Sequence, residues 1–327
     1  MLITPRSLQP REGRHHPSVE RLVQEGLEPV YPDRSGPLPA DVLQRWVRDV
    51  VAAIVGLDSV DRRVVEAAPL LRVIARYGSG YDRVDVAACT QRGIPVTVTP
   101  DANTVAVAEY TLALLLSLAR HVPEHHRMVL EGRWTPRRGV ELAGRRLGVV
   151  GLGRIGQAVA RRASALGMDI SYYDVVRQGP DVESALGVRW MELDALLAWA
   201  DVITLHAPHT PGAPPLIGRR ELARMRPGAL LVNTARGELV DEVALAEALE
   251  SGHLGGAAVD VFAQEPPPAS HPLLHAPRVI LSPHAAAQTE EAQRRMADAA
   301  VEAVLDVLGG RRPRHVVNPE VYDAPRQ

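Results

Sequence analysis

The feature that most constrains this chain is a set of three glycines at 151–156, in the pattern Gly-x-Gly-x-x-Gly. An apolar run at 147–150 precedes it, and a helical pattern at 154–166 follows it. In such a strand–turn–helix unit Gly151 permits the tight turn, Gly153 lets the backbone approach a pyrophosphate, and Gly156 lets helix and strand pack closely. The helix N-terminus adds unpaired N–H groups and partial positive charge. The sequence therefore predicts a dinucleotide-binding unit.

An acidic residue at the end of the next strand completes this motif. Asp174 follows the apolar run 170–173 and lies 18 residues after Gly156. Its carboxylate is expected to accept hydrogen bonds from the adenosine ribose hydroxyls and to repel a 2′-phosphate. The motif therefore favours NAD over NADP, although Arg177, three residues further on, weakens that preference. The alternative is a structural turn followed by a surface aspartate.

Short apolar runs rich in β-branched residues alternate with helical patterns along most of the chain. This alternation predicts an α/β fold in which parallel sheets are covered by helices. Expected helices between the first strands lie at 59–67 and 85–91. The expected strands lie at 51–55, 72–75, 96–99, 147–150, 170–173, 202–206, 230–233, 257–261 and 279–282.

The length of 327 residues suggests about two domains. Pro100 closes the first β/α series and Pro283 closes the second. Only one amphipathic helix, at 289–308, and a tail follow, which is too little for a domain. We therefore expect that helix to pack back on the first series. The expected domains are a discontinuous substrate-binding domain of residues 1–101 plus 288–327 and a dinucleotide-binding domain of residues 102–287.

Composition excludes several classes of function. All 37 basic residues counted as Lys or Arg are arginines, which excludes Schiff-base chemistry and the lysine-dependent phosphate loop. A formal net charge of -2 argues against a nucleic-acid partner. The single cysteine, Cys89, forms neither an internal disulfide nor a cysteine-rich zinc site. We expect no metal and a cytoplasmic location.

The helix expected at 103–120 is almost entirely apolar. Its most apolar stretch, 111–119, is shorter than the roughly 20 residues that a membrane span requires, so no membrane partner is expected. The helix is also more apolar than the surface helix of one domain should be. We therefore expect it to form much of a two-fold homodimer interface.

Three later segments each place a charged side chain beyond an apolar strand, at the sheet edge where α/β proteins bind ligands. Arg236, in the run Asn-Thr-Ala-Arg-Gly, can hold a carboxylate through two hydrogen bonds. His284, in the run Ser-Pro-His, can exchange a proton with a reacting hydroxyl near neutral pH. Taken alone, Glu265 is explained better as a solvated acid on a loop than as a site residue. His284 is explained equally well as a capping or core histidine and as a proton donor. Arg236 could be a surface arginine.

Taken together, in order and spacing, these segments resemble the D-isomer-specific 2-hydroxyacid dehydrogenases, and most closely their phosphoglycerate dehydrogenase-like branch. The resemblance runs from about residue 2 to residue 310. It implies two doubly wound, Rossmann-like α/β domains with the active site in a cleft between them. The segments that carry it are 76–82, 103–109, 151–156, Asp174, 233–237, 260–266 and 282–284.

The resemblance also implies a reaction, the NAD-dependent interconversion of a small D-2-hydroxy acid and its 2-keto acid. D-3-phosphoglycerate, glyoxylate and hydroxypyruvate are candidate substrates. His284 would be the general acid/base, Glu265 would orient it and stabilise its charged form, and Arg236 would bind the substrate carboxylate. Ser79 and Gly80 would donate backbone N–H groups to the same carboxylate. Arg76 matches a position that could reach a substrate phosphate. The implied cofactor-binding residues are Thr104, Gly151, Gly153, Arg154, Ile155, Gly156, Asp174, His206, Pro208, Thr234, Ala235, Arg236, Asp260 and His284.

Two other functions remain open on the same scaffold. One is a corepressor-like protein that senses NAD(H) without catalysis, because a fold does not determine a function. The other is a formate or phosphite dehydrogenase. The loop at 209–215 departs from the family pattern, since His-Thr-Pro-Gly stands where the family usually has Leu-Thr-Pro and a threonine. A loop expected near the cofactor is therefore altered.

Overall fold

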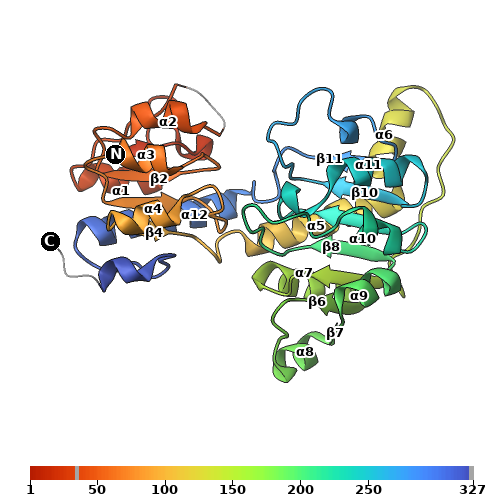
Figure 1. Cartoon of the computed structure of the whole chain (residues 1–327). Helices are drawn as coiled ribbons and strands as arrows, with labels where there is room; N and C mark the ends of the chain where they lie inside the picture. Colours follow the sequence, from red (N-terminus) through yellow and green to blue (C-terminus); the bar gives the residue numbers. More distant parts are fainter. Residues whose placement is uncertain (34–36, 324–327) are drawn as a thin grey trace. The chain divides into compact units, whose positions relative to one another are not determined.

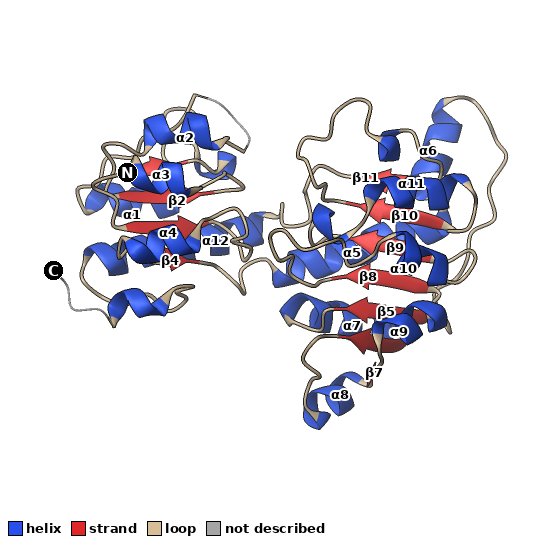
Figure 2. Cartoon of the chain, in the orientation of Figure 1, coloured by secondary structure: helices blue, strands red, loops and turns tan. Residues whose placement is uncertain are grey.

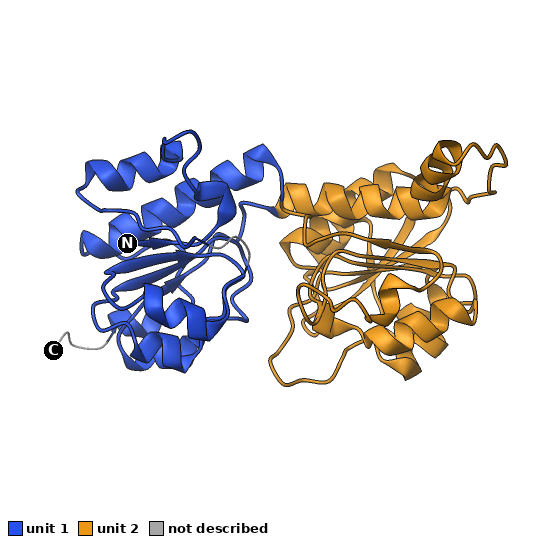
Figure 3. Ribbon diagram, turned by 90° about the horizontal axis from the view of Figure 1, so that it is seen from above, with its two compact units in different colours: residues 1–103, 288–327 blue, residues 104–287 orange. Residues whose placement is uncertain are grey.

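The structure is a computed structural model that describes residues 1–33 and 37–323. It divides into two compact units, shown in different colours in Figure 3. Unit 1 comprises Met1–Asn103 and Gln288–Gln327, and unit 2 comprises Thr104–Ala287. Each unit is built on a parallel sheet covered by helices, which confirms the predicted α/β fold (Figure 2).

Unit 1 contains a four-stranded sheet in the order β1-β2-β3-β4. Side chains alternate along its strands, so that Ala53 and Val55 face one helical layer while Ala52 and Ile54 face the other. The first layer consists of α2, α3 and α4, and the second of α1 and α12. The elements are β1 Leu2–Ile3, α1 Pro17–Gln24, α2 Ala40–Trp46, β2 Ala52–Val55, α3 Arg62–Glu66, β3 Val73–Arg76, α4 Val86–Gln91, β4 Val96–Thr97 and α12 Glu290–Leu308.

The four named strands of unit 1 follow the sequence order, and a parallel bridge between Leu2 and Val30 extends the sheet beyond β1. The second helical layer includes α12, which comes from the far end of the chain and packs against β2 and β3. Ser18 on α1 donates a hydrogen bond of 2.7 Å to Asp298 on α12, which ties the two helices of this layer together.

Unit 2 contains a seven-stranded sheet in the order β11-β10-β9-β8-β5-β6-β7 (Figure 1). The chain passes from β5 outward to β6 and β7, then returns to β8 on the other side of β5. This reversal creates a switch point between β5 and β8, where open α/β sheets bind ligands. The strands are β5 Arg146–Val150, β6 Asp169–Tyr173, β7 Arg189–Trp190, β8 Val202–Leu205, β9 Leu230–Asn233, β10 Gly256–Val259 and β11 Val279–Leu281.

Helices cover both faces of this sheet. Residues of α5 and α7 build the core on one face, and residues of α9, α10 and α11 build it on the other. The helices are α5 Thr104–Arg120, α6 Val122–Leu130, α7 Arg154–Ala165, α8 Pro180–Leu186, α9 Leu193–Trp199, α10 Arg219–Arg224 and α11 Glu242–Glu250. Short 3₁₀ helices lie at Arg6–Leu8, Gly237–Leu239, Pro272–Leu274 and Pro319–Tyr322.

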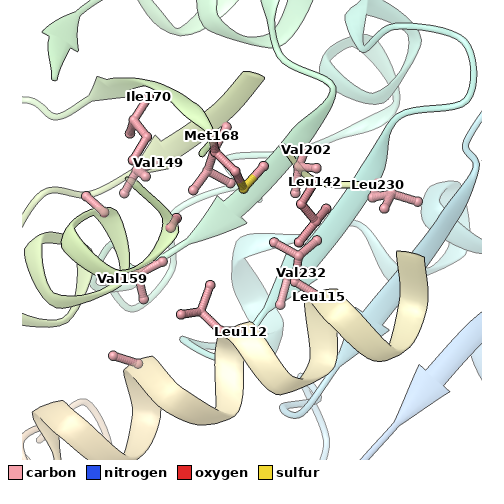
Figure 4. Close-up of a cluster of buried hydrophobic side chains, with 14 of the residues drawn as sticks. Leu112, Leu115, Leu142, Val149, Val159, Met168, Ile170, Val202, Leu230 and Val232 are labelled. Atoms are coloured by element: carbon pink, nitrogen blue, oxygen red, sulfur yellow. The ribbon is translucent and has the colours of Figure 1, made fainter. Parts of the chain in front are cut away.

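The apolar helix α5 is a core helix of unit 2. Leu112 and Leu115 point toward the sheet, near Val232 of β9, and belong to the same buried cluster (Figure 4). This burial accounts for the apolar character of α5 without a partner chain. No single helix in the described part of the chain is long and apolar enough to span a membrane, and only the bent pair α5 and α6 passes that test together.

Candidate active site

One row of residues across the sheet of unit 2 organises the candidate site. The parallel register pairs Tyr173 with Val150, Val150 with Leu205, Leu205 with Asn233, Asn233 with Val259, and Val259 with Leu281. Six strands therefore end level with one another. Most of the predicted site residues of unit 2 follow this row by one to three positions, so the sheet brings them to one edge.

The glycine turn after β5 depends on two close backbone approaches. Gly151 has φ of +92°, and a Cβ there would lie 2.6 Å from the backbone nitrogen of Ala207. A Cβ on Gly156 would lie 2.1 Å from the carbonyl oxygen of Gly151. Gly153 differs, because a Cβ there would meet nothing within 4 Å. Two of the glycines are thus required by packing, and the third borders open space.

That open space lies at the start of α7, a helix of 12 residues. Gly153 is its N-cap and supplies no side-chain hydrogen bond to the first turn. The backbone N–H groups of this turn are therefore oriented to bind an anion such as a pyrophosphate. Thr104 adds a buried hydroxyl that has no hydrogen-bond partner within residues 1–33 and 37–323. These observations fit a dinucleotide cofactor.

Asp174 contacts the glycine turn directly. One carboxylate oxygen accepts a hydrogen bond of 2.8 Å from the N–H of Leu152, and the other accepts one of 3.3 Å from Val176. The side chain is thereby fixed at the end of β6, beside the turn. Beyond it, Val175 and Val176 are 86% and 69% exposed.

His206 follows β8 at the switch point, and its backbone lies against Gly151. Its Nε2 is 2.9 Å from the hydroxyl of Thr204. Desolvation of the ring lowers the pKa of His206 to about 3, so the imidazole is neutral at physiological pH. Pro208 is exposed, and the altered loop that follows contains a turn in which Ala213 donates to the carbonyl of Thr210 at 3.0 Å.

Arg236 lies on a turn held by a buried amide that the sequence analysis did not count among the site residues. The side chain of Asn233 accepts from the N–H of Ala235 at 3.0 Å and donates to the carbonyl of Arg236 at 2.8 Å. Arg236 itself donates to the carbonyl of Ala235 at 2.6 Å. The hydroxyl of the neighbouring Thr234 pairs with that of Thr111 on α5 at 2.9 Å.

Gly237 brings the Arg236 turn against the segment that leads to Glu265. A Cβ on Gly237 would lie 2.0 Å from the carbonyl carbon of Phe262 and 2.1 Å from the nitrogen of Ala263. Only glycine permits this approach. The position therefore fixes the spacing between the turns that carry Arg236 and Glu265.

His284 and Glu265 form a close pair. The Nδ1 atom of His284 lies 2.9 Å and 3.0 Å from the two carboxylate oxygens of Glu265. The side chains are 26% and 12% exposed. A carboxylate at Nδ1 fixes the ring with its proton on that nitrogen and leaves Nε2 as the atom for proton exchange. Glu265 is held in turn by the N–H of Phe262 at 3.2 Å.

The backbone of His284 is in the left-handed region, with φ of +53°. Asp260, which is fully buried, holds this conformation. Its carbonyl accepts from the N–H of His284 at 2.7 Å, and its carboxylate accepts from Ser282 Oγ at 2.6 Å. The N–H groups of Ala285 and Ala286 add bonds of 2.8 Å and 2.9 Å to the same carboxylate. Asp260 thus orders the segment that presents His284.

A second pair holds the loop that carries Glu265. Glu242, at the start of α11, accepts from the N–H of Ala263 at 3.0 Å and pairs with Nε2 of His271 at 3.0 Å. The His271 ring stands edge-on to Phe262, with ring centres 5.5 Å apart. No motif in the sequence connected Glu242 or His271 with the site.

The remaining predicted residues lie in unit 1 or at the edge of the glycine turn. In unit 1, Arg76 is 7% exposed and donates to the carbonyl of Tyr77, so it shapes the loop that follows β3. Ser79 and Gly80 are half-buried on that loop, which is anchored by mutual hydrogen bonds of 3.0 Å between Gly78 and Thr99. Arg154 and Ile155 begin α7 in unit 2. No cluster of three or more metal-ligating side chains occurs within residues 1–33 and 37–323.

Comparison with known proteins identifies the relatives of this chain. Residues 112–286 match the family described as D-isomer specific 2-hydroxyacid dehydrogenase, NAD binding domain. The chain is 44% identical over 299 residues to a glyoxylate reductase of Korarchaeum cryptofilum, which covers 89% of this chain and 90% of that protein. It is 45% identical over 262 residues to a D-3-phosphoglycerate dehydrogenase of Methanocaldococcus jannaschii, which covers 79% of this chain but only 50% of that protein.

A solved structure supports the same relationship. The NAD-dependent formate dehydrogenase of Staphylococcus aureus, in complex with NAD, superposes with a TM-score of 0.84 at 31% identity. The match covers 97% of this chain and 98% of that one. The chain therefore belongs to the D-isomer specific 2-hydroxyacid dehydrogenase family. It is an NAD-dependent 2-hydroxyacid oxidoreductase, as the resemblance in its sequence implied.

Proposed function

We propose that this enzyme reduces a small 2-keto acid to the D-2-hydroxy acid and catalyses the reverse reaction, with His284 as its acid/base. Bound NADH supplies a hydride to C2 of the keto acid. The Nε2 atom of His284 gives the proton to the carbonyl oxygen, and in oxidation it takes that proton back. Glu265, within 3.0 Å of Nδ1, stabilises the imidazolium and keeps the ring oriented. This pair is the observation that carries the proposal.

Arg236 is assigned to the substrate carboxylate and to the carbonyl oxygen. A guanidinium binds a carboxylate through two hydrogen bonds and also stabilises the negative charge that develops on the oxygen during hydride transfer. Unit 1 is proposed as the substrate-binding domain, with the backbone N–H groups of Ser79 and Gly80 as its candidate donors to a carboxylate. The burial of Arg76 supports a role in shaping this loop.

Glyoxylate is the substrate we favour, with hydroxypyruvate next. The K. cryptofilum glyoxylate reductase matches over nearly its whole length, whereas the chain spans half of the M. jannaschii phosphoglycerate dehydrogenase. The similarity to a formate dehydrogenase makes formate oxidation the alternative. Formate gives up a hydride and becomes CO2 without losing a hydroxyl proton, so it does not require the His284–Glu265 pair.

The test is a substrate panel followed by absorbance at 340 nm. Glyoxylate, hydroxypyruvate, phosphohydroxypyruvate and pyruvate are offered with NADH, and formate with NAD. We expect glyoxylate to give the highest kcat/KM and His284→Ala to lower it by about 10²–10⁴-fold, the usual value of a positioned acid/base. His275→Ala is a matched control, since His275 lies on an exposed loop of unit 2 and bonds only a local carbonyl among the contacts described. A rate on formate that exceeds every keto-acid rate contradicts the proposal.

The cofactor is assigned to the carboxyl ends of β5, β6 and β8. The N-terminal turn of α7, beside Gly153, would hold the pyrophosphate, and Asp174 would hold the adenosine ribose. Val175 and Val176 offer exposed apolar surface for the adenine. Arg154, Ile155, His206, Pro208 and Ala235 line the same edge. Asp260 is assigned to the His284 segment rather than to the nicotinamide, because its carboxylate already accepts three hydrogen bonds.

The enzyme is proposed to be a homodimer, through a surface beside the one first expected. The exposed apolar side chains lie on α6 and the segment 131–140 more than on α5. Leu130 is 74% and Trp134 is 85% exposed, and other residues of α5, α6 and this segment line a pocket of about 420 Å³. Exposed apolar surface of this kind suits a two-fold contact with a second copy.

Light scattering tests the dimer. We expect a mass twice the 35.4 kDa of the chain, and a monomer for the Leu130→Glu, Trp134→Glu double variant. Val175→Glu serves as the control, because Val175 is 86% exposed at another place on unit 2. A monomeric parent protein at micromolar concentration contradicts the proposal.

We also propose a cytoplasmic location, since the single cysteine, Cys89, is buried and forms no disulfide.

A further inference from the structure

Arg177, the cation nearest to Asp174 in sequence, is held by another side chain. Its guanidinium donates two hydrogen bonds of 2.9 Å to the two carboxylate oxygens of Glu183 on α8. Glu183 also accepts a bond of 2.8 Å from the hydroxyl of Tyr172 on β6. The same hydroxyl accepts from the N–H of Gln178 at 2.9 Å, so it fixes the backbone beside Arg177 as well.

We propose that Glu183 sets cofactor selectivity by keeping Arg177 away from the position of a 2′-phosphate. This inference rests on the proposed placement of the adenosine ribose at Asp174. A 2′-phosphate on that ribose is repelled by the Asp174 carboxylate, and a neighbouring arginine is the group best able to offset the repulsion. Arg177 lies only three residues beyond Asp174 but is already paired with a carboxylate.

The two partners differ in freedom of movement. The Glu183 side chain is 14% exposed and is bound to Tyr172, whereas the Arg177 side chain is 63% exposed. Arg177 is therefore the member that moves when the pair is broken. Bonds from Arg177, and then from Tyr172, hold the pKa of Glu183 at about 2, so the carboxylate stays charged at every pH suitable for an assay. Glu183 is therefore a positioning residue, and its effect on the cofactor passes through Arg177.

The test is direct binding, measured by quenching of protein fluorescence in titrations with NADPH and NADH. Glu183→Gln keeps an acceptor for Tyr172 but removes the charge that holds Arg177. We expect the Kd for NADPH to fall by about 1.5-fold to fivefold, the range that suits a partly exposed ion pair. The Kd for NADH, which has no 2′-phosphate, is expected to change by less.

Two further variants show whether Arg177 is responsible. In the Glu183→Gln, Arg177→Ala double variant the gain in NADPH affinity should disappear, as in a double-mutant cycle. Glu247→Gln is the matched control, because it breaks a similar ion pair with Arg219 elsewhere on unit 2. Its NADPH affinity should equal that of the parent protein.

Several results would overturn the inference. It fails if Glu183→Gln leaves NADPH affinity unchanged, or if the gain survives removal of Arg177. Arg177→Ala alone changes only an exposed side chain, so it tests the idea even if the Glu183 variant does not fold. A several-fold loss of NADPH affinity in Arg177→Ala would mean that Arg177 already reaches the phosphate. Failure of the parent protein to bind NADH contradicts the cofactor site itself, whereas normal NADH binding with unaltered selectivity contradicts only the role of Glu183.

Discussion

Replacing Gly237 by alanine tests whether the close approach of two turns sets the geometry of catalysis. The added Cβ would lie 2.0 Å from the carbonyl carbon of Phe262, and both neighbours are backbone atoms that cannot rotate away. Ordinary contact begins at 3.4 Å, so the turns must separate by about 1.4 Å, the difference between these distances. The displaced turns carry Arg236 on one side and lead to Glu265 on the other.

A displacement of this size should cost activity more than cofactor binding. Misplacing catalytic groups by 1 Å lowers rates by about 10²-fold, so we expect kcat/KM for the keto acid to fall by at least that factor. The overpacked contact should also lower the free energy of unfolding by about 1–3 kcal/mol. NADH binding should change less, because the glycine turn after β5 belongs to other strand ends.

The assay compares kcat/KM, NADH affinity and thermal unfolding for three proteins. Gly179→Ala is the control, since Gly179 has φ of −66° and a Cβ there would meet nothing within 4 Å. It should leave all three quantities close to those of the parent. A folded Gly237→Ala variant whose kcat/KM stays within threefold of the parent would refute the argument that this contact sets the spacing.

Three further changes have distinct expected outcomes. Gly153→Ala introduces no clash within the chain, so the protein should keep its melting temperature while its Kd for NADH rises about tenfold or more, measured by fluorescence titration. Asp260→Asn removes an acceptor from the His284 segment and should lower kcat by about 10–100-fold in steady-state kinetics, with a smaller change in NADH affinity. Burial alone would raise the pKa of Asp201, but hydrogen bonds from Arg146 outweigh it and keep the pKa below its usual value. Asp201 therefore stabilises the fold above its unfolded pKa, and this contribution is lost as the pH falls through its lower folded pKa. In urea unfolding Asp201→Asn should cost about 1–3 kcal/mol at pH 7, and the cost should shrink below about pH 4.

Most of the fold could be predicted because its strands are continuous apolar runs and its helices carry regular patterns. The expected strand at 230–233 coincides with β9, and the helix expected at 103–120 differs from α5 by one residue. The strands β1 and β7 were not predicted, because each has two residues and two residues form no alternating pattern. The expected strand 96–99 was too long, since pairing in β4 ends at Thr97.

The dimer prediction rested on the apolar composition of α5, and the burial of α5 gives that composition a second explanation. The apolar run of α5 predicted a partner surface, but Leu112, Leu115 and Leu118 are buried inside unit 2. A helix covered by a sheet, by α7 and by α6 needs no second chain to explain its composition. Exposed apolar residues such as Leu130 and Trp134 lie outside any long apolar run, so no pattern in the sequence distinguishes them.

For the candidate site, whether a residue could be predicted depends on how far along the chain it lies from the row where the strands end. Gly151, Asp174 and His284 follow their strands by one to three residues, so a strand prediction places them at the sheet edge. Glu265 lies six residues beyond Val259 in a loop, and only the family resemblance connected it with His284. Glu242 and His271 act on a backbone N–H group and on a neighbouring ring of another segment, and such contacts depend on loop paths that no local pattern encodes. The groups that do the chemistry are thus readable from strand ends, whereas the groups that hold them in place become visible only when distant segments are brought together.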